Sequence, residues 1–493
     1  MVRVQEGEQA NQSTYSNVGA FFVVAQKGKN INLYLRRVNQ SNKIMDLARK
    51  CNYSIFLLAT ILFSIISCGD MDDFMYEQEQ ALDEQTDPLI NFLWSGGVTE
   101  NAAKVTAQVS LDSDSIRLVL STHKDLVSPT YSDYKISDSI ANNRVVTFDL
   151  ASLESNTQYY YGLEIDNNAE RVINYTGKFN TVSNEPMSFS FAFGACSKSA
   201  DGSVYNTIAN EDILFFLHAG DLHYNDIGSN DINRFRSAYE NQLSGTDMGR
   251  LFKNTAMAYM WDDHDYGPNN SDANAAGRNS SRLAYQQFVP HHPLDAGSGD
   301  VPIYQSFNVG RVLFILTDNR SERTPYRIST SNKTVLGTEQ KTWFKNKLLE
   351  AQGAYPLIVW VNTFPWISEE GEGDDGWEWY QEERNEIANF IVDNDIKGLC
   401  MLSGDAHMIA IDDGTNSNYS DADGQGFPVF HAGALSRSGS KKGGPYSHGA
   451  FPGAGQYGLM SVEDQGGNEI KVEWSGRNLS REIIEYSFDV KAN

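Results

Sequence analysis

Four short apolar runs, each followed at once by a motif of chemically active side chains, constrain the fold of this chain more than any other feature. Their length and their aliphatic and aromatic content are typical of buried strands. In open α/β sheets, ligands bind beyond the carboxyl ends of the strands, so we expect the four motifs to meet at one place. The motifs are Gly194-Ala195-Cys196, Gly220-Asp221-Leu222-His223-Tyr224, Trp261-Asp262-Asp263-His264-Asp265 and Gly404-Asp405-Ala406-His407.

The side chains of these motifs suit a metal cluster, and that chemistry favours phosphate esters as substrates. Asp221 follows a glycine at a strand end, and its carboxylate can bridge two cations. The thiolate of Cys196 and the phenolate of Tyr224 would favour a Lewis-acidic ion such as ferric iron over magnesium. The remaining candidate ligands offer oxygen and imidazole donors and are Asp263, His264, Asp405 and His407.

Each of these residues also has a plainer interpretation. A Gly-Asp pair at a strand end is usually only a turn, and a single cysteine is more often a small buried hydrophobe. Cys400 lies inside an apolar run, and we assign it to the core. The joint occurrence of four such strand ends, in order, is what indicates a metalloenzyme.

Two further segments could bind a phosphate group. The strand predicted at 312–317 is followed by Asp318-Asn319-Arg320, and the fork of an arginine suits phosphate oxygens. Segment 435–444 is basic and glycine-rich in an acidic chain, and it contains Lys441 and Lys442. This segment is either a mobile surface loop or a loop that contacts the substrate phosphate.

Residues 89–183 predict a small all-β sandwich, because short alternating strands are separated by polar turns. Residues 153–159 resemble the turn that leads into the tyrosine corner of fibronectin type III domains. The sandwich is therefore expected to be fibronectin III-like or immunoglobulin-like. Tyr159 is either the corner tyrosine or an ordinary strand aromatic. We find no chemistry in this part and expect it to brace the catalytic part.

Residues 186–493 predict one large α/β domain, because strands alternate with helical patterns. Thr338 is expected to cap the third helix. Trp343, Leu348 and Leu349 are expected on the apolar side of that helix. The predicted helices are 231–244, 278–288, 338–351 and 379–395.

The front of the chain predicts an export signal. Residues 45–67 combine a basic start with an uncharged, mostly apolar run of 15 residues, as in a lipoprotein signal peptide. A membrane-spanning helix is the alternative, but it needs about 20 apolar residues. We predict that Cys68 is the lipidated first residue, that 68–88 is an acidic tether, and that 1–44 is an upstream artefact.

The chain is acidic, with 39 basic and 64 acidic side chains and a formal net charge of −25. Residues 1–67 hold eight basic and three acidic side chains, so the rest holds 31 and 61, a net charge of about −30. This charge argues against nucleic acid as a standing partner, because phosphate backbones attract basic faces. After cleavage and lipidation, Cys196 and Cys400 are the two cysteines that could still form a disulfide. A single possible disulfide does not make a disulfide scaffold.

In their order and residue types, the four motifs resemble those of the alkaline phosphatase D family of calcineurin-like metallophosphoesterases. The resemblance covers roughly Phe189 to His407, with the all-β sandwich placed as in many members. It implies a metallophosphatase-type β-sandwich flanked by helices. Cys196 stands where the wider superfamily carries its first Asp-x-His motif.

The same resemblance implies the cofactors. Cys196 and Tyr224 would hold Fe³⁺, Asp221 would bridge, and Ca²⁺ would complete the cluster, with other divalent metals possible. An asparagine after the third motif binds calcium in one branch of the family, and Asn269 and Asn270 are the candidates here. The implied metal ligands are Cys196, Asp221, Tyr224, Asp263, Asn270, Asp405 and His407.

The activity that the resemblance implies is alkaline phosphomonoesterase, by in-line attack that releases inorganic phosphate. Asp263, His264 and Arg320 would be the catalytic residues, with His264 stabilising or protonating the leaving alkoxide and Arg320 clamping a phosphate oxygen. A phosphodiesterase or phospholipase D-type hydrolase is the alternative, and a surface binding lipoprotein with structural metals is a third. We expect a monomer, lipid-anchored in a bacterial cell envelope, on the periplasmic side or the cell surface.

Overall fold

The computed structural model describes six parts of the chain, which belong to two compact units, residues 1–82 and 83–493. In the first unit, β1 (Ala20–Lys27) pairs antiparallel with β2 (Asn30–Arg37). The predicted signal peptide, Cys68 and the acidic tether lie outside the described residues. The described parts are 20–27, 30–37, 89–166, 175–328, 332–369 and 375–491.

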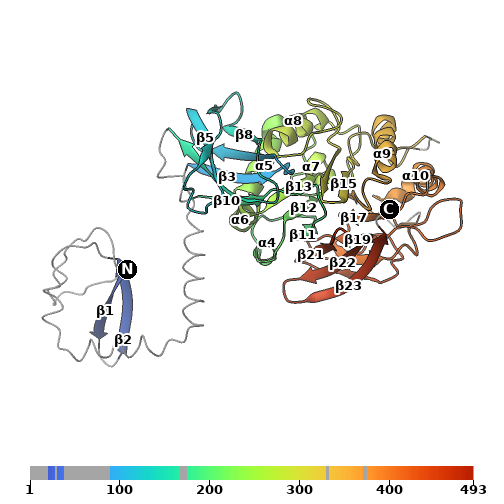
Figure 1. Ribbon diagram of the computed structural model, residues 1–493. Helices are drawn as coiled ribbons and strands as arrows, with labels where there is room; N and C mark the ends of the chain where they lie inside the picture. The colour runs from blue at the N-terminus through green and yellow to red at the C-terminus, as the bar shows by residue number, and fades with distance from the viewer. Residues whose placement is uncertain are drawn as a thin grey trace. The chain divides into compact units, whose positions relative to one another are not determined.

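Two large sheets form the frame of the second unit (Figure 1). The central strands of each sheet run parallel, so their carboxyl ends share an edge. The nine-stranded sheet has the order β23 (Glu482–Lys491), β22 (Glu469–Asn478), β21 (Gln456–Glu463), β11 (Phe189–Gly194), β12 (Phe215–Ala219), β13 (Ala256–Met260), β3 (Ile90–Gly96), β4 (Ala103–Val109) and β8 (Val145–Leu150). The seven-stranded sheet has the order β14 (Gln305–Val309), β15 (Val312–Leu316), β16 (Leu357–Asn362), β17 (Leu399–Ser403), β19 (Val429–Ala432), β18 (Met408–Asp412) and β20 (Ala450–Pro452).

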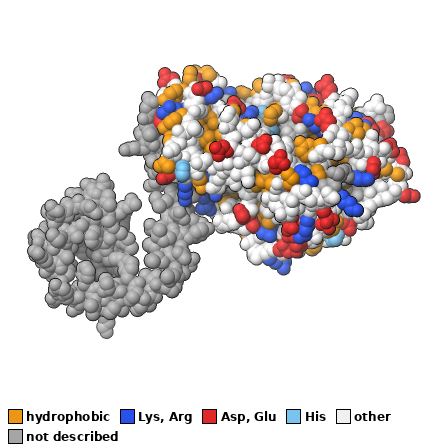
Figure 2. Space-filling view, viewed as in Figure 1, with side chains coloured by type: hydrophobic (Ala, Val, Ile, Leu, Met, Phe, Trp, Pro, Cys, Tyr) orange, Lys and Arg blue, Asp and Glu red, His pale blue; other side chains and the backbone are white. Residues whose placement is uncertain are grey.

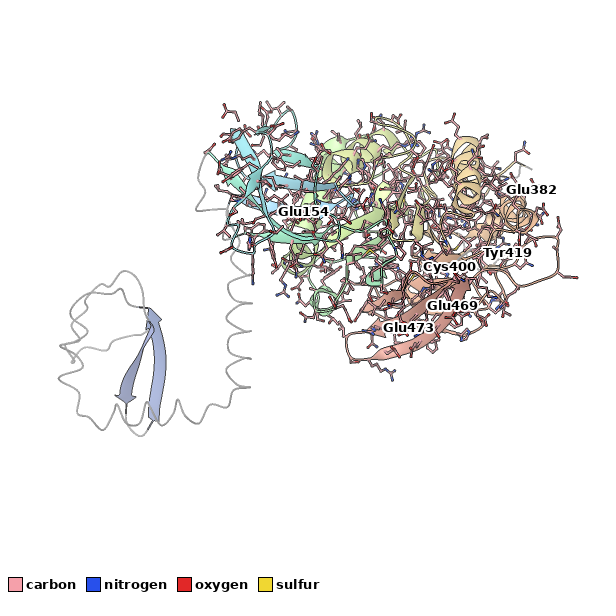
Figure 3. All side chains as sticks on the ribbon, viewed as in Figure 1. Glu154, Glu382, Cys400, Tyr419, Glu469 and Glu473 are labelled. Atoms are coloured by element: carbon pink, nitrogen blue, oxygen red, sulfur yellow. The ribbon has the colours of Figure 1, made fainter. Side chains whose placement is uncertain are left out.

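The two sheets pack face to face around one apolar core. Successive residues of a strand point to opposite sides, so a strand contributes alternately to this core and to the core on its other face. On β16, Val359 belongs to the core between the sheets, whereas Trp360 belongs to the core under the helices. Phe193 of β11 meets Phe430 of β19 edge to face, with ring centroids 4.8 Å apart. Cys400, labelled in Figure 3, is a buried free thiol in the same core, as predicted.

Helices cover the outer faces of both sheets, which gives four layers in the order α/β/β/α (Figure 1). Phe252 of α6 stacks on Trp94 of β3 at 5.6 Å, and Phe344 of α9 packs on Trp360 of β16 at 4.5 Å. Among the described residues, no helix has both the length and the apolar character to cross a membrane. The helices are α4 (Ser203–Ala209), α5 (Ile232–Leu243), α6 (Thr246–Asn254), α7 (Asp263–Tyr266), α8 (Arg278–Phe288), α9 (Gly337–Ala351) and α10 (Gln381–Asp393), with a 3₁₀ turn, η2 (Trp377–Tyr380), before α10.

A small β-sandwich precedes the two-sheet frame and shares one of its sheets. Its second layer has five strands, β10 (Gly177–Asn180), β9 (Gln158–Ile165), β5 (Ser113–Ser121), β6 (Thr130–Tyr131) and β7 (Lys135–Ser137). Its first layer is β3, β4 and β8, and β3 pairs in parallel with β13 through Gly96 and Met257. The hydroxyl of Tyr159 accepts a hydrogen bond of 2.9 Å from the backbone N–H of Glu154, the residue labelled in Figure 3, which is the contact of a tyrosine corner.

The four predicted helices were right in position, α4 and α6 were not predicted, and two details of α9 were wrong. The helix begins at Gly337 after Leu336, with no side-chain cap, so Thr338 lies inside the first turn. Leu349 is 40% exposed, whereas Phe344 is fully buried. The buried positions are spaced by three and four residues, and Leu349 is one residue off that stripe next to the buried Leu348.

Charged side chains of both signs are spread over the surface (Figure 2). On the face shown in Figure 2, Asp and Glu side chains are spread out, with Lys and Arg between them. Pairs such as Lys341 and Glu386, 2.6 Å apart, are partly exposed, and pairs of this kind typically contribute only about 0–1 kcal/mol. The fold therefore depends on its apolar cores and on the buried ionic groups described next.

Candidate metal centre

Three of the four motifs begin their turn with a residue in the left-handed backbone region. Cys196 after β11, Asp221 after β12 and Asp405 after β17 have φ angles of 67°, 59° and 55°. This conformation is unusual for a residue other than glycine and costs on the order of 1–3 kcal/mol where it is strained. Such strain persists only where the surroundings enforce it, and here it turns three side chains away from the strand direction.

Two glycines bring the strand ends into contact. A Cβ atom on Gly404 would lie 2.4 Å from the carbonyl oxygen of Ala219 and 2.8 Å from the Cβ of Ala195. A Cβ atom on Gly220 would lie 2.5 Å from the Cβ of Asp262. Since Gly404 belongs to one sheet and Ala195 and Ala219 to the other, no larger residue would let the two sheets approach this closely.

The carboxylate of Asp221 is the meeting point of the first two motifs. The thiol of Cys196 lies 3.6 Å from its Oδ2, and the hydroxyl of Tyr224 donates to the same oxygen at 2.9 Å. Tyr224 also reaches the fourth motif, with its Oη 3.5 Å from Nε2 of His407. Cys196 lies 3.8 Å from the backbone oxygen of Asp405. Residues from three distant parts of the chain thus converge.

The third motif joins the cluster through His264 and Asp263. One ligand atom each of Asp221, Asp263 and His264 lies within 4.8 Å of the other two, close enough to hold one metal ion. Nδ1 of His264 is 2.6 Å from Oδ1 of Asp226, and its ring centroid is 4.1 Å from that of Tyr224. Asp226 was not among the predicted residues, although it follows Asp221 by five positions in the same turn.

Buried carboxylates crowd this site. Burial and the neighbouring carboxylates, Asp263 foremost, raise the pKa of Asp221 well above its ordinary value. Burial also raises the pKa of Asp405, although Lys442 opposes it with Nζ 2.5 Å from Oδ1. Oδ1 of Asp263 and Oδ2 of Asp405 are buried and accept no hydrogen bond. Because uncompensated buried charge is strongly unfavourable, these residues fit bound cations.

The soft donors fit the same interpretation. Burial raises the pKa of the Cys196 thiol well above its ordinary value, and the charges of Asp221 and Asp405 raise it further. Burial and Asp221 also raise the pKa of Tyr224. A thiolate and a phenolate therefore need a multiply charged cation beside them, since a bound metal ion strongly favours the deprotonated ligand.

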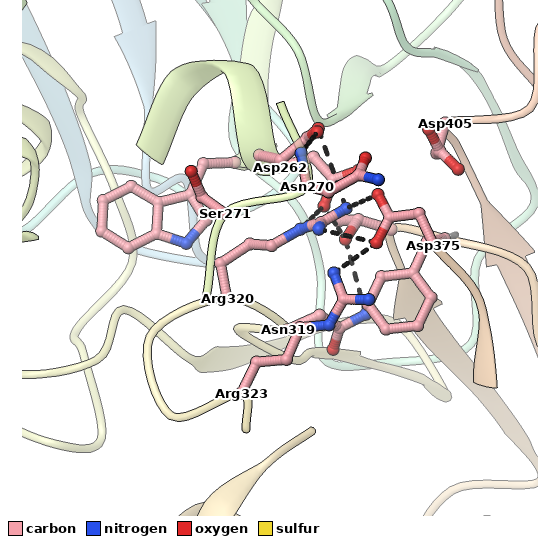
Figure 4. Close-up of polar contacts among 12 residues, drawn as sticks. Asp262, Asn270, Ser271, Asn319, Arg320, Arg323, Asp375 and Asp405 are labelled. Atoms are coloured by element: carbon pink, nitrogen blue, oxygen red, sulfur yellow. Dashed lines mark hydrogen bonds and ion pairs between the residues drawn. The ribbon is translucent and has the colours of Figure 1, made fainter. Parts of the chain in front are cut away.

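Arg320 lies in a buried ionic network beside the cluster (Figure 4). Both of its terminal nitrogens donate to the carboxylate of Asp375, at 2.9 Å each, and its Nε donates to Oδ1 of Asp262 at 2.5 Å. Its guanidinium is also 3.7 Å from Oδ1 of Asp263. The contacts present are those of a residue that positions Asp262 and Asp263, and the clamping of a phosphate oxygen by Arg320 stays a prediction.

Asp375 links two buried arginines. Figure 4 shows its carboxylate between Arg320 and Arg323, and it accepts hydrogen bonds from both. Burial raises its pKa, but the two guanidinium groups outweigh burial and hold the pKa well below its ordinary value. No motif marked Asp375 in the sequence, because its partners lie more than 50 positions away.

The remaining predicted residues lie at the rim of the network. The backbone N–H of Asn270 donates to Oδ2 of Asp263 at 2.5 Å, and its side-chain oxygen accepts from Asn269 at 2.8 Å. Figure 4 shows Asn270 on the same side of Arg320 as Asp262. Lys442 is bound to Asp405, whereas Lys441 is exposed.

Together these features describe a four-layer sandwich with a buried cluster of carboxylate, thiol, phenol and imidazole groups at the carboxyl ends of its parallel strands. The chain belongs to the PhoD-like phosphatase family, whose model matches residues 191–452, just over half of the sequence.

Individual relatives agree with this assignment. Alkaline phosphatase D of Bacillus subtilis (strain 168) is 23% identical over 366 residues, which are 63% of this chain and 59% of that protein. The solved structure of PhoD is similar at a TM-score of 0.66 and 16% identity, over 82% of this chain and 90% of that one. Purple acid phosphatase PPD1 from yellow lupin (Lupinus luteus) seeds is similar at a TM-score of 0.57 and 14% identity, over 81% of this chain and 73% of that one. Both structures share the fold.

The ionic network predicts a large effect of Asp375→Asn. The substitution leaves Arg320 and Arg323 buried without their shared carboxylate, so the free energy of unfolding should fall by about 3–5 kcal/mol. Metal content should fall as well, because Arg320 positions Asp263. Urea unfolding and elemental analysis measure the two effects.

Asp395→Asn is the matched control. Asp395 pairs with Lys397 at 2.8 Å with both side chains exposed, and it has a positive φ that asparagine tolerates. Loss of this exposed ion pair should change the free energy of unfolding by about 0–1 kcal/mol. Equal, small changes for both variants would show that Asp375 does not stabilise the network.

Proposed function

We propose that this protein is a metal-dependent hydrolase of phosphate esters that acts first on phosphomonoesters and releases inorganic phosphate. The observation that most supports this proposal is that Cys196 and Tyr224 both contact the carboxylate of Asp221. Nearby carboxylate oxygens have no hydrogen-bond partner. Membership of the PhoD-like family and the similarity to alkaline phosphatase D support the same reaction class.

The cofactors proposed are Fe³⁺ and Ca²⁺. Cys196 and Tyr224 would hold the iron, and Asp221 would bridge it to a second ion. When bound, such ions supply Lewis-acid binding of the phosphate and neutralisation of its developing charge. The other proposed ligands are Asp263, Asn270, Asp405 and His407.

His264 is proposed as the general acid, and Asp226 as the residue that orients it. The contact of Nδ1 with Asp226 fixes the ring and leaves Nε2 to donate a proton to the oxygen of the leaving alcohol.

Two other functions remain as alternatives. A phosphodiesterase or phospholipase D-type hydrolase would use the same metal cluster and a different pocket wall. A surface binding lipoprotein with structural metals would turn over neither ester. Assays of p-nitrophenyl phosphate and bis-p-nitrophenyl phosphate, with calcium and with chelator, separate these three classes.

The test of the proposed reaction is Asp221→Asn with Asp212→Asn as its control. Asp221 follows β12 at the site, whereas Asp212 is exposed before the opposite end of the same strand. Asp221→Asn should lower monoesterase activity at least about 100-fold, since even residues that only orient metal ligands contribute 10–100-fold. Asp212→Asn should keep full activity and metal content. Full activity in Asp221→Asn would rule out the assigned centre.

The iron assignment predicts colour. A phenolate bound to ferric iron absorbs visible light by charge transfer, so the purified protein should be coloured and Tyr224→Phe should bleach it. Tyr160→Phe is the control, because the hydroxyl of Tyr160 bonds an exposed glutamine in the small sandwich. A colourless, fully active protein without iron would contradict the assignment of Cys196 and Tyr224.

We also propose that Cys68 anchors the protein by lipid in a bacterial cell envelope, as a monomer without a nucleic-acid partner. The signal-like run before Cys68 and the acidic segment after it support this location. Expressed in bacteria, the protein should partition into the detergent phase of Triton X-114, and Cys68→Ser should move it to the aqueous phase. Cys51→Ser, altered before the predicted cleavage site, should behave as the unaltered protein. Equal partitioning of both variants would argue against the anchor.

A further inference from the structure

The loop that follows β19 is fixed at both ends to the metal-site motifs. On one side, the backbone N–H of Ser436 donates to the carbonyl oxygen of Cys196 at 3.2 Å. On the other, the N–H of Ser440 donates to the carbonyl oxygen of His407 at 3.0 Å, and its hydroxyl is 3.1 Å from Nδ1 of that ring. The loop therefore has a defined position over the cluster.

Arg437 lies between these two anchors and points at the cluster. Its guanidinium carbon is 4.5 Å from the centre of the Tyr224 ring, which is the separation of a cation–π contact. Its Nε is buried and has no hydrogen-bond partner. A buried donor of a charged group without an acceptor is unfavourable unless a ligand supplies one.

The other cations at the site already have carboxylate partners. Arg320 and Arg323 share Asp375, and Lys442 is bound to Asp405. No acidic side chain of the described residues lies within ion-pairing distance of Arg437. Of these four cations, Arg437 is thus the one without a carboxylate partner, whereas Arg323 has one open donor, Nη2, beside its ion pair with Asp375.

We propose that Arg437 is the residue that binds the phosphate group at this centre, through its guanidinium fork and two non-bridging oxygens. The inference rests on the proposed function, and it names the substrate class of that site. A monoester has three non-bridging oxygens, so the fork can hold two while one remains for the cluster. A diester has only two, and the fork and the cluster would compete for them. Arg437 therefore selects monoesters over diesters.

The experiment uses metal-loaded protein and inorganic phosphate as the probe. Arg437→Gln should weaken phosphate binding, measured by isothermal titration calorimetry, on the order of 10- to 100-fold, because hydrogen bonds to a charged group are lost. The kcat/KM for p-nitrophenyl phosphate should fall by a similar factor, and that for bis-p-nitrophenyl phosphate should change much less. Metal content should stay at the level of the unaltered protein.

Two further variants isolate the cause. Arg437→Lys keeps a positive charge near Tyr224 but removes the fork, so it should also lose most of the phosphate affinity. Lys397→Gln removes one exposed positive charge before the amino end of β17, opposite the site, and should bind phosphate as the unaltered protein does. It controls for a general change in net charge.

The outcomes separate the two proposals. Unchanged phosphate affinity in Arg437→Gln and Arg437→Lys overturns the role of Arg437, and so does a shift of the visible absorption band with phosphate affinity intact, which would make Arg437 a partner of Tyr224 alone. If the unaltered protein hydrolyses neither ester, the proposed function fails, while the phosphate titration still decides whether Arg437 is an anion site.

Discussion

The close contact between the two sheets at Gly404 is the constraint on which the centre depends. Asp405 and His407 come from the seven-stranded sheet, whereas Cys196, Asp221 and Tyr224 come from the other. These groups can share ions only if the two edges touch, and a Cβ at Gly404 would collide with Ala219 and Ala195. The aromatic core behind the contact, including Phe193 and Phe430, keeps the sheets in that position. The close packing of the two sheets is thus a condition for these side chains to form one site.

Charge balance is the second requirement of the centre. Buried carboxylates repel one another, and the chain compensates some of them with its own cations. Arg320 serves Asp262 and Asp375, and Lys442 serves Asp405. The compensation stops at Asp221, whose pKa is raised by burial and by its acidic neighbours. Bound metal ions would complete the balance at that point, and their charge would explain why a cluster so unfavourable on its own is built into the fold.

Local patterns in the sequence were sufficient for four of the helices and for the order of the motifs, whereas α4 and α6 were not predicted. The helix predicted at 278–288 has these limits in the structure, because apolar runs and polar breaks are local signals. Residues that act through distant partners carry no such signal. Asp375 meets Arg320 and Arg323 across more than 50 positions, and β3 joins β13 across more than 160 positions. The sequence also could not reveal that Arg320 is bound by carboxylates.

The arrangement of the cations follows from the same physics. A guanidinium that is already held by two carboxylates is a poor receptor for phosphate, because binding would first have to break charge-assisted hydrogen bonds in a buried site. An arginine held by the face of a ring gives up much less, since a cation–π contact leaves the edge donors available. Arg437 contacts the ring of Tyr224, whereas Arg320 is held by carboxylates. Arg320 thus positions the acidic motif, and Arg437 is left to receive the anion.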